Sequence, residues 1–572
     1  MAIYTLKIKT PEDLADLRQS FREQTESYRH TIYVCGGAGC VSSNSDSVVQ
    51  ALKKAMALRG LSQEVRMVVT GCVGLCAQGP CMIVDPDGVF YGNLTPEKVK
   101  MIVDRHLIGG RPIEEYCYYD AVKEKYIPYT RDLPFFSKQV KIALRNVGRI
   151  DFSSVEDYIG HDGYFALAKV LSDWGREKTI EEITASGLRG RGGAGFPTGM
   201  KWSFVPRNTG KPVYIVVNAD EGEGGTYKDH FLLLEDPHRL IEGLIIAGWA
   251  LGARTAYIYA RGEFLPCIES VNKALNEAYA AGYLGENIMG TKFCFDIFVH
   301  RGAGAYIRGE ETALINSLEG QKGQPRLKPP FPAVAGAWAS PTCVNNVETI
   351  MSLPWIFSHP VEEYTKMGTP RAHGTKVFCV SGDVKRPGLY EAPLGTPLME
   401  MLTSEEYCQG IIGNLKGVIP GGSSCPPLLP EECQDATLDY ECMASLKTMF
   451  GSGAIIVFND THNAVDILDV LGHFYSHESC GQCTPCREGT GFAKRVLDSI
   501  MRGEGHDGDI ELLQGISAGF GGTTICPLSI SLGGPLNVYT RKYRADFEEY
   551  IAKNPNHAEP RLRPTVRLGA YW

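Results

Sequence analysis

The sequence predicts a multidomain α/β protein, and three observations support this fold class. At 572 residues the chain exceeds the length of one ordinary domain, so several cores are expected. Helix-patterned stretches alternate with strand-like ones through the middle of the chain, as in an α/β sheet covered on both faces. Many of the 18 cysteines cluster at short spacings, which is typical of metal or iron–sulfur ligation.

Composition narrows the range of partners. The net charge is -9 and the sequence pI is about 5.9, with no basic stripe, so nucleic acid is not expected as a partner. The longest apolar run, Leu244–Ala253, is far short of the roughly 20 residues that a membrane-spanning helix needs. The polar opening Met1–Thr10 does not have the pattern of a signal peptide. These features predict a cytoplasmic protein, in which a disulfide framework is not expected.

Residues 1–110 form the first predicted domain. Strand-like Ile32–Val34 leads into C-x4-C, and strand-like Glu64–Val69 leads into C-x3-C. Thiolates at strand ends beside glycines suit a [2Fe–2S] cluster, with a zinc ribbon as the alternative. A further cysteine, Cys81, is interpreted as a thiol of a strand core. The predicted ligands are Cys35, Cys40, Cys72 and Cys76.

Residues 111–149 form a predicted linker. This segment is rich in Tyr and Pro, including Tyr116–Tyr119 and Pro134–Phe136. Its aromatic side chains are expected to pack one domain against the next rather than to hold a cofactor.

A glycine-rich loop, Gly187–Trp202, opens the predicted α/β domain of residues 150–371. Arg191 and Lys201 add positive charge to glycines whose backbone N–H groups can turn toward an anion. The loop contains G-x-G-x-x-G, but it follows a helix-patterned segment, and Pro197 and Gly199 disfavour a helix after it. The pattern alone leaves a phosphate site and a solvated loop as alternatives.

Acidic residues follow the strand-like run Val213–Asn218. Asp220, Glu221 and Glu223 lie at the carboxyl end of this strand, where open α/β sheets bind ligands. Carboxylates at this position can accept hydrogen bonds from ribose or ribityl hydroxyls, and the alternative is a solvated acidic turn. Two further ordered motifs, Arg301–Thr312 and Asn345–Thr349, follow along the chain.

The last third contains a β-rich region and then a second cysteine cluster. Residues 372–454 carry Cys408, Cys425, Cys433 and Cys442 without paired spacing, so these are predicted to be ordinary thiols rather than zinc ligands. Residues 455–550 contain C-x2-C-x2-C and a later Cys-Pro, which predict a [4Fe–4S] cluster over structural zinc. Residues 551–572 form a tail, either a docking arm or a disordered end. The predicted cluster ligands are Cys480, Cys483, Cys486 and Cys526.

Together these motifs resemble the family of flavoprotein, NADH-oxidising subunits of respiratory complex I. The resemblance extends from about Pro134 to Tyr550 and includes relatives in NAD-linked hydrogenases and formate dehydrogenases. It implies a thioredoxin-like ferredoxin domain fused at the N-terminus, a Rossmann-like FMN domain, a small ubiquitin-like β-grasp domain and a C-terminal helical bundle with an iron–sulfur cluster. The expected cofactors are FMN, NAD(H), one [2Fe–2S] and one [4Fe–4S].

The same resemblance implies the roles of individual residues. Glu223 and Glu310 are expected to position the nicotinamide and tune the flavin. Arg308 stands where relatives have cysteine, and a charge there could alter the flavin potential. The residues implied to hold FMN or NADH are Gly190, Arg191, Gly192, Gly193, Lys201, Asn218, Asp220, Glu221, Glu223, Tyr306, Gly309, Glu310, Glu311, Asn345, Asn346 and Thr349, with Phe196, Phe204 and Phe331 beside NADH.

The implied activity is hydride transfer between NAD(H) and FMN, followed by single-electron transfer to the [4Fe–4S] cluster. The expected partners are an iron–sulfur-rich catalytic subunit, together with a small [2Fe–2S] thioredoxin-like subunit. Hydrogenase is the first choice for the catalytic partner and formate dehydrogenase the second, and electron bifurcation is compatible with either. The alternative function is a non-catalytic iron–sulfur electron relay or scaffold with a repurposed flavin site.

Overall fold

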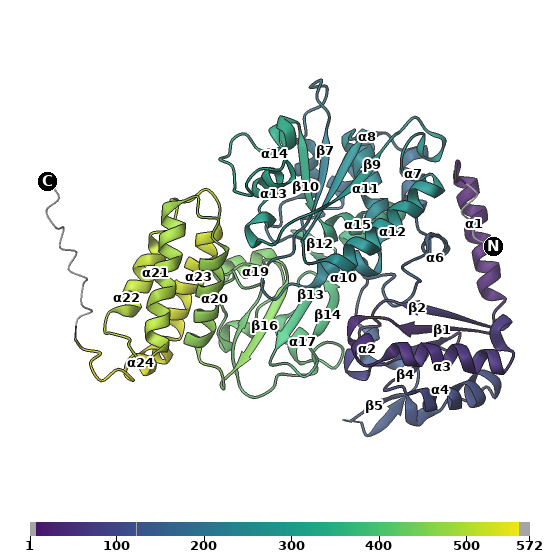
Figure 1. Ribbon diagram of the computed structural model, residues 1–572, viewed down its shortest axis with the longest axis horizontal. Coiled ribbons are helices and arrows are strands. Elements are labelled where there is room, and N and C mark those ends of the chain that lie inside the picture. The colour runs from purple at the N-terminus through teal and green to yellow at the C-terminus, as the bar shows by residue number, and fades with distance from the viewer. Residues whose placement is uncertain (1–6, 122, 560–572) are drawn as a thin grey trace.

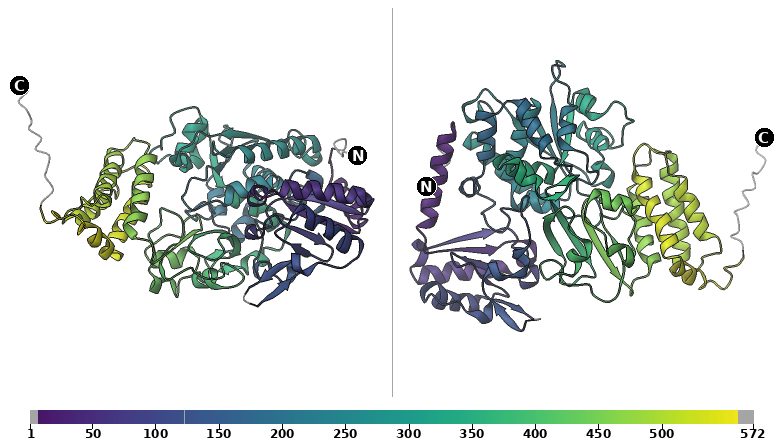
Figure 2. Two further views of the ribbon diagram at one scale, coloured as in Figure 1. Left: turned by 60° about the horizontal axis from the view of Figure 1, so that its bottom comes forward. Right: turned by 180° about the vertical axis from the view of Figure 1, so that it is seen from behind.

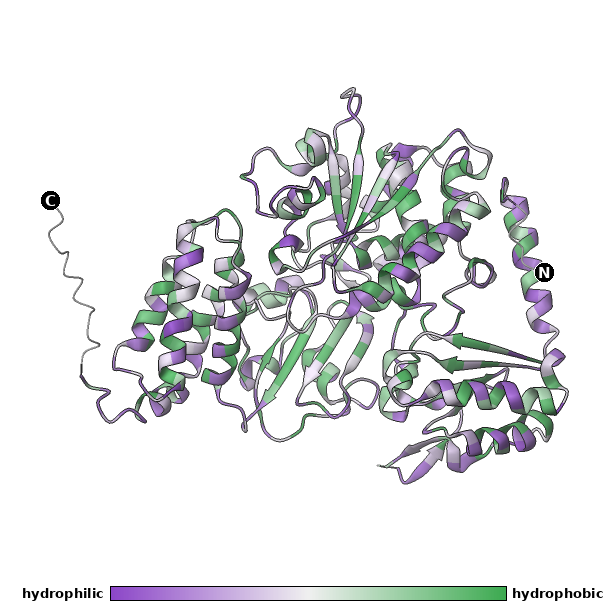
Figure 3. Ribbon diagram, viewed as in Figure 1, coloured by the Kyte–Doolittle hydropathy of each residue, from purple (hydrophilic) through white to green (hydrophobic). Residues whose placement is uncertain are grey.

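The computed structural model describes residues 7–121 and 123–559. Three four-stranded sheets and a group of C-terminal helices follow one another along the chain (Figure 1). The N-terminal helix and the C-terminal helices lie at opposite ends of the molecule in every view (Figure 2). Hydrophobic residues concentrate in the sheet strands, whereas the outer helices alternate hydrophobic and hydrophilic positions (Figure 3).

The first sheet brings the two N-terminal cysteine pairs to one end. Its strand order is β2 (Val65–Thr70), β1 (His30–Cys35), β3 (Met82–Asp85) and β4 (Val89–Tyr91). Strand β1 pairs in parallel with β2 and antiparallel with β3. Because parallel strands end at the same edge, Cys35 and the loop after β2 meet there. Helices α3 (Ser45–Leu58) and α4 (Pro96–Ile102) contribute buried residues to the core of this sheet.

The N-terminal helix α1 (Pro11–Glu26) packs away from this sheet. It contacts α6 (Val155–Gly160) and α7 (Phe165–Asp173), and its buried Leu14 belongs to the core of the second sheet. Arg18 Nη1 lies 2.9 Å from Asp162 Oδ1 at the same contact. The predicted domain of residues 1–110 is therefore divided, because the apolar stripe of α1 is buried on the neighbouring domain.

The segment predicted as a linker contains structure of its own. It forms the hairpin of β5 (Tyr118–Asp120) and β6 (Lys125–Ile127), followed by α5 (Pro134–Ser137). The Phe135 ring lies 5.9 Å from the Tyr390 ring between centroids, and a Cβ on Gly74 would lie 2.6 Å from it. Phe135 thus joins the Cys72–Cys76 loop to the third sheet, as expected for an aromatic residue of this segment.

The second sheet is entirely parallel and is covered on both faces. Its order is β10 (Thr342–Asn346), β7 (Tyr214–Ala219), β8 (Thr255–Ala260) and β9 (Asp296–Arg301). Ile215 and Val217 pack with α11 (Pro237–Leu251) and α15 (Val347–Ser358), and α12 (Leu265–Ala281) contributes to the same core. Val216 packs with α13 (Glu311–Leu318) on the opposite face. This alternation buries both faces and leaves the carboxyl ends of the strands to form a site.

The third sheet has the order β14 (Gly388–Pro393), β13 (Thr375–Gly382), β16 (Ala454–Asn459) and β15 (Leu415–Ile419). The domain boundary predicted at residue 454 is wrong by one strand. Strand β16 pairs in parallel with β13, so the sheet extends to residue 459.

Five helices complete the described chain. Helices α20 (Ala464–Glu478), α21 (Thr484–Met501) and α23 (Leu528–Lys542) pack together with α22 (Asp509–Ala518) and α24 (Arg544–Ile551). Most of the tail predicted for residues 551–572 lies outside the described residues, which end at residue 559. No helix among residues 7–121 and 123–559 is long and apolar enough to cross a membrane.

Candidate functional site

The glycine-rich loop connects α8 (Arg176–Ala185) to α9 (Thr198–Ser203). A helix therefore precedes it, as predicted, but the expectation that no helix follows is wrong. Pro197 caps α9 from outside the first turn, where its missing N–H is not needed. Gly195 has a φ of 62°, and a Cβ there would lie 2.2 Å from the Tyr440 ring, so only glycine fits.

The loop offers free hydrogen-bond donors. Within the described parts of the chain, nothing accepts a hydrogen bond from the backbone N–H groups of residues 192–195. Ideal Cβ atoms on Gly190 and Gly193 would meet only backbone atoms, at 3.5 Å or more, so no side chain lies directly against these two residues. Consecutive free N–H groups can form an anion-binding nest, a donor set that suits the phosphate of FMN.

The two predicted cationic residues of the loop take different places. Arg191 is fully buried beneath the loop, where its Nη2 donates to Tyr364 Oη at 3.0 Å and to the His373 carbonyl at 2.9 Å. Its Nε and Nη1 have no acceptor within the described chain. Lys201 Nζ donates to the Val344 carbonyl at 2.7 Å, beside the end of β10. The positive charge of Arg191 therefore supports the loop from within the protein.

The predicted amides meet at the ends of two neighbouring strands. Asn218 on β7 is paired in register with Asn346 on β10, directly after Asn345. Asn218 Nδ2 donates to the Gly309 carbonyl at 2.7 Å. Thr349 Oγ1 accepts from the Arg191 backbone N at 2.8 Å, so the start of α15 also holds the glycine loop.

Asp220 is a buried carboxylate without a hydrogen-bond donor among the residues that the structure describes. Its relative exposure is 8%. Burial raises the pKa of Asp220 to about 7, with Arg261 opposing this shift and Glu263 adding to it; Arg308 opposes it more weakly. A buried carboxylate without a donor is suited to accept hydrogen bonds from cofactor hydroxyls.

Unlike Asp220, the Glu221 carboxylate has hydrogen-bond donors within the protein, which corrects the prediction that it binds cofactor directly. Its Oε1 accepts from the Asp229 N at 2.7 Å, and its Oε2 accepts from the His230 N at 3.2 Å. The His230 ring Nδ1 also lies 3.0 Å from Glu221 Oε2. Both oxygens are thus used to fix the start of α10 (Lys228–Glu235), so Glu221 supports the site from behind.

Glu223 lies where three parts of the chain meet. It accepts from Tyr306 Oη at 2.7 Å, from Ser423 Oγ at 3.1 Å and from the Ser424 N at 2.7 Å. Ser423 and Ser424 come from the third sheet's region, so the acidic turn is held by a loop that is about 200 residues distant in sequence. Burial raises the pKa of Tyr306, which therefore remains a hydrogen-bond donor.

The segment after β9 brings Glu310 and Glu311 to the same edge. Glu310 Oε2 caps α13 by accepting from the Thr312 N at 2.8 Å and the Ala313 N at 3.0 Å. Lys328 Nζ lies 3.1 Å from Glu310 Oε1 and 2.6 Å from Glu311 Oε1. Lys201 Nζ lies 4.0 Å from Glu311 Oε2, which links this pair to the glycine loop.

Three phenylalanines predicted beside NADH are solvent-exposed. The exposed fractions are 44% for Phe196, 53% for Phe204 and 58% for Phe331, which excludes a core role for each. The rings of Phe196 and Phe204 lie 6.2 Å apart between centroids. Exposed rings near the glycine loop can stack on a planar heterocycle that must also leave.

The four C-terminal cysteines line one cavity. Cys480, Cys483, Cys486 and Cys526 face it together with Ile307 and Pro325 from the second domain. The Ile525 N lies 3.4 Å from Cys483 Sγ and donates to it. Four thiols around one apolar cavity, with a backbone donor to sulfur, form the donor set that a [4Fe–4S] cluster requires.

The N-terminal cysteines also converge. Cys72 Sγ lies 3.6 Å from Cys76 Sγ, and the Gly74 N donates to Cys72 Sγ at 3.3 Å. The Cys72 N donates to Glu235 Oε2 at 2.7 Å, so α10 of the second domain holds this loop. Burial raises the pKa of Glu235. The Cys35 thiol contacts the thiols of both Cys40 and Cys72, so Cys35 and Cys40 complete a four-thiol set that fits a [2Fe–2S] cluster.

Sequence reasoning did not anticipate the place of Cys81. It is buried, but its Sγ lies 4.0 Å from Cys40 Sγ rather than among apolar side chains alone. The signal in the sequence was weak, since Cys81 follows Gly79 and Pro80 without the short spacing of a cysteine pair.

Asparagine at position 220 should make the KM for NADH insensitive to pH near neutrality. In the unsubstituted protein we expect this KM to fall as the pH rises through about 7, because the Asp220 carboxylate forms over that range and accepts more strongly when charged. D220N should raise the KM about tenfold at pH 8, because it removes one hydrogen bond to a charged group. Steady-state kinetics between about pH 6 and pH 8 measure both effects.

Asp236 provides a matched control for this experiment. Burial also raises its pKa to about 7, but its carboxylate accepts from Asn146 Nδ2 at 2.9 Å, at the start of α11. D236N should therefore keep the pH dependence of the KM. A pH profile that D220N leaves unchanged would contradict a role for Asp220 in binding NADH.

Comparisons with known proteins agree with this geometry. Residues 183–355 match the family described as Nuo51 FMN-binding domain, and residues 466–550 match the iron–sulfur binding region of NADH-ubiquinone oxidoreductase-F. Residues 14–106 match the thioredoxin-like [2Fe–2S] ferredoxin family, and residues 377–404 match the SLBB domain. These matches confirm the predicted FMN, [2Fe–2S] and [4Fe–4S] cofactors.

Relatives that cover most of the chain include an NADH-quinone oxidoreductase subunit of Rhizobium meliloti, 46% identical over 72% of this chain and 97% of the relative. The mitochondrial NADH dehydrogenase [ubiquinone] flavoprotein 1 of Dictyostelium discoideum is 44% identical over 74% of this chain and 92% of the relative. A chain of the air-oxidized NAD+-reducing [NiFe]-hydrogenase is similar in structure, with a TM-score of 0.63 and 27% identity, over 95% of this chain and 91% of that chain.

Proposed function

Because this chain belongs to the family of NADH dehydrogenase flavoproteins that includes the Rhizobium and Dictyostelium relatives, we propose that it exchanges electrons between NAD(H) and an iron–sulfur partner enzyme. Its direct reaction would be NADH oxidation, or NAD+ reduction, at a bound FMN. Bound FMN would supply two-electron chemistry toward the nicotinamide and one-electron chemistry toward an iron–sulfur cluster.

One observation carries this proposal. The 3-10 turn η7 (Tyr306–Gly309) touches both the acidic strand ends and the cavity of the C-terminal cysteines. Tyr306 Oη donates to Glu223, and the next residue, Ile307, lines the cysteine cavity. A cofactor held at the strand ends would therefore lie one short turn of backbone away from the cluster site.

The protein's own contribution is binding and orientation. The free N–H groups of residues 192–195 would hold the FMN phosphate, and Asp220 and Asn218 would accept or donate to ribityl or ribose hydroxyls. Glu223 and Glu310 would position the nicotinamide, since each is fixed by several donors and yet remains partly exposed, unlike the buried Glu221. No side chain needs to transfer a proton for the hydride step.

We assign hydrogenase as the first choice of partner. The hydrogenase chain aligns with 95% of this chain, whereas the Rhizobium and Dictyostelium relatives cover 72% and 74% of it. A small [2Fe–2S] thioredoxin-like subunit is the second expected component, and formate dehydrogenase is the alternative catalytic partner. Two cluster sites on one chain would also permit electron bifurcation.

Affinity purification of the full chain from its native source tests the partner. A copurifying hydrogenase subunit is the expected result, and a copurifying formate dehydrogenase would replace it as the partner. Bifurcation would require that two acceptors of different potential are reduced in fixed proportion, which stoichiometric assays of the purified complex measure.

The activity itself is tested on the isolated chain. Purified protein should show flavin absorbance and should reduce ferricyanide with NADH. Protein that contains iron but neither binds FMN nor oxidises NADH would reject the proposed activity and favour a non-catalytic relay.

Removal of either exposed ring beside the glycine loop should weaken NADH binding. F196A or F204A should raise the KM for NADH about threefold to tenfold while leaving the FMN content unchanged, because stacking of one ring contributes about 1 kcal/mol. Phe492 is 50% exposed on α21 and provides the matched control, since F492A removes a similar ring far from the loop. Equal effects of F204A and F492A would contradict the proposed stacking.

A further inference from the structure

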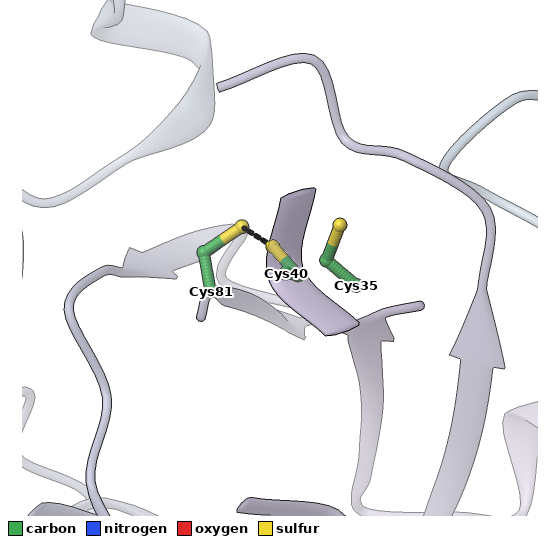
Figure 4. A group of neighbouring side chains, drawn as sticks. All are labelled: Cys35, Cys40 and Cys81. Atoms are coloured by element: carbon green, nitrogen blue, oxygen red, sulfur yellow. Dashed lines mark hydrogen bonds between the residues drawn. The ribbon is translucent and has the colours of Figure 1, made fainter. Parts of the chain in front are cut away.

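The N-terminal cluster site contains more sulfur than one [2Fe–2S] cluster needs. Cys35 ends β1, Cys40 lies on α2 (Ala38–Ser42), and Cys81 directly precedes β3. The Sγ atoms of these three residues all lie within 4.8 Å of one another (Figure 4). With Cys72 and Cys76 nearby, five thiols surround a cluster that binds four.

The distances place Cys81 within reach of the iron that Cys40 would bind. Thiolates bound to one tetrahedral metal at about 2.3 Å lie about 3.8 Å apart. Cys72 and Cys76, which form one predicted ligand pair, have Sγ atoms 3.6 Å apart. Cys40 and Cys81 have Sγ atoms 4.0 Å apart, so an iron bound by Cys40 would also lie within bonding reach of Cys81.

The backbone holds Cys81 in this position. The Cys35 N donates to the Cys81 carbonyl at 3.0 Å, and the next residue, Met82, pairs with Val34 on β1. The Cys81 side chain is only 1% exposed. A Cβ on Gly79 would lie 3.0 Å from Cys40 Sγ, so the segment before β3 wraps closely around that sulfur. Cys81 is thus placed by the sheet rather than by a loose loop.

We propose that Cys81 is a reserve ligand of the [2Fe–2S] cluster, able to bind the iron that Cys40 binds. The site would then have two alternative four-cysteine sets, one with Cys40 and one with Cys81. When Cys81 replaces Cys40, the bond between Cys40 and the iron breaks and a bond between Cys81 and the iron forms. The proton that the Cys81 thiol loses is taken up by the released Cys40 thiolate, with no change in oxidation state. This inference rests on the [2Fe–2S] cofactor and not on the proposed NADH activity.

Cysteine variants of the full-length protein test the proposal. C40A should keep most of the [2Fe–2S] signal in electron paramagnetic resonance of the reduced protein, with shifted g values, whereas C40A/C81A should lose it. C81A alone should keep the signal unchanged. Iron and acid-labile sulfide should likewise be retained in C40A and C81A and lost in C40A/C81A.

Two further variants serve as controls, one expected to lose the cluster and one expected to keep it. C76A should lose the cluster, because Cys81 is grouped with Cys35 and Cys40 but not with Cys76. C117A should change nothing, because Cys117 is a buried thiol of the same domain that donates to the Ile113 carbonyl instead. FMN content of each preparation, which depends on the second domain, reports whether the chain has folded.

Loss of the cluster in C40A to the same extent as in C40A/C81A would overturn the proposal. Loss of the cluster in C81A alone would also overturn it, since Cys81 would then be an obligatory ligand. If alanine at position 40 makes the protein insoluble, C40S keeps the shape of the side chain. Identical spectra of C40S and C40S/C81A would then contradict ligation by Cys81.

Discussion

C526A should abolish electron delivery to the partner enzyme while preserving NADH oxidation with ferricyanide. Cys526 lines the cavity from the segment between α22 and α23, whereas the other three cavity thiols belong to the C-x2-C-x2-C segment. Without its thiolate the cubane lacks one iron ligand, and iron content should fall. We expect partner-linked activity to decrease by about 100-fold or more, a change of at least about 2.7 kcal/mol in the barrier.

The ferricyanide assay separates this loss from a general folding defect. It depends on the second domain, whose parallel sheet and glycine loop have their own core. C294A is the matched control, because Cys294 is a partly exposed thiol whose Sγ lies 3.7 Å from the Lys292 carbonyl. Partner-linked activity that survives in C526A with full iron content would contradict the assignment of Cys526 as a ligand.

The parts of the site that sequence predicts best are those with short-range chemical patterns. Cysteine spacing identifies eight thiols, and the structure brings each set of four together. Strand periodicity predicts that Asn218 ends a buried strand and that Asp220 follows it, and the pairing of β7 with β10 then brings Asn346 beside Asn218. These patterns are local because metal ligation and strand ends need particular residues at fixed spacings.

Long-range contacts explain what the sequence could not reveal. Arg191 and Glu221 carry charges that suit ligand binding, but both side chains are directed into the protein. Arg191 donates to Tyr364 and to the His373 carbonyl, and Glu221 accepts from the start of α10. Cys81 joins the other thiols only because β3 pairs antiparallel with β1. Each of these outcomes depends on packing between segments that are far apart in the chain, which periodicity does not encode.

E348A should strongly destabilise the junction between the second and third sheets. Glu348 at the start of α15 lies 2.9 Å from Lys228 Nζ and 2.5 Å from Lys376 Nζ, and its Oε1 accepts from the Val377 N at 2.8 Å. All three side chains are buried. Alanine would leave two ammonium groups near each other without this carboxylate, at a cost of about 3–5 kcal/mol. Calorimetry of the holoprotein should show a transition lowered by about 10 °C.

The pH dependence of this junction gives an independent check. Burial raises the pKa of Glu348, but Lys228 and Lys376 outweigh burial and lower it to about 2. Because this folded-state pKa lies below the ordinary glutamate value of 4.5, the stabilisation is present above about pH 4.5 and is lost as the pH falls toward 2. E348A should remove this part of the acid sensitivity.

The double variant E348L/K376M distinguishes a paired charge from a packing position. Burial lowers the pKa of Lys376 to about 8, and in the intact protein its ammonium donates to Glu348 Oε2 at 2.5 Å and to the Val377 carbonyl at 3.3 Å. Removing both charges leaves Lys228 paired with Asp229 at 2.7 Å, and similar side-chain volumes fill the junction. The double variant should therefore recover most of the stability that E348A loses. If it is as unstable as E348A, the junction depends on the shape and backbone hydrogen bond of Glu348 rather than on the balance of buried charge.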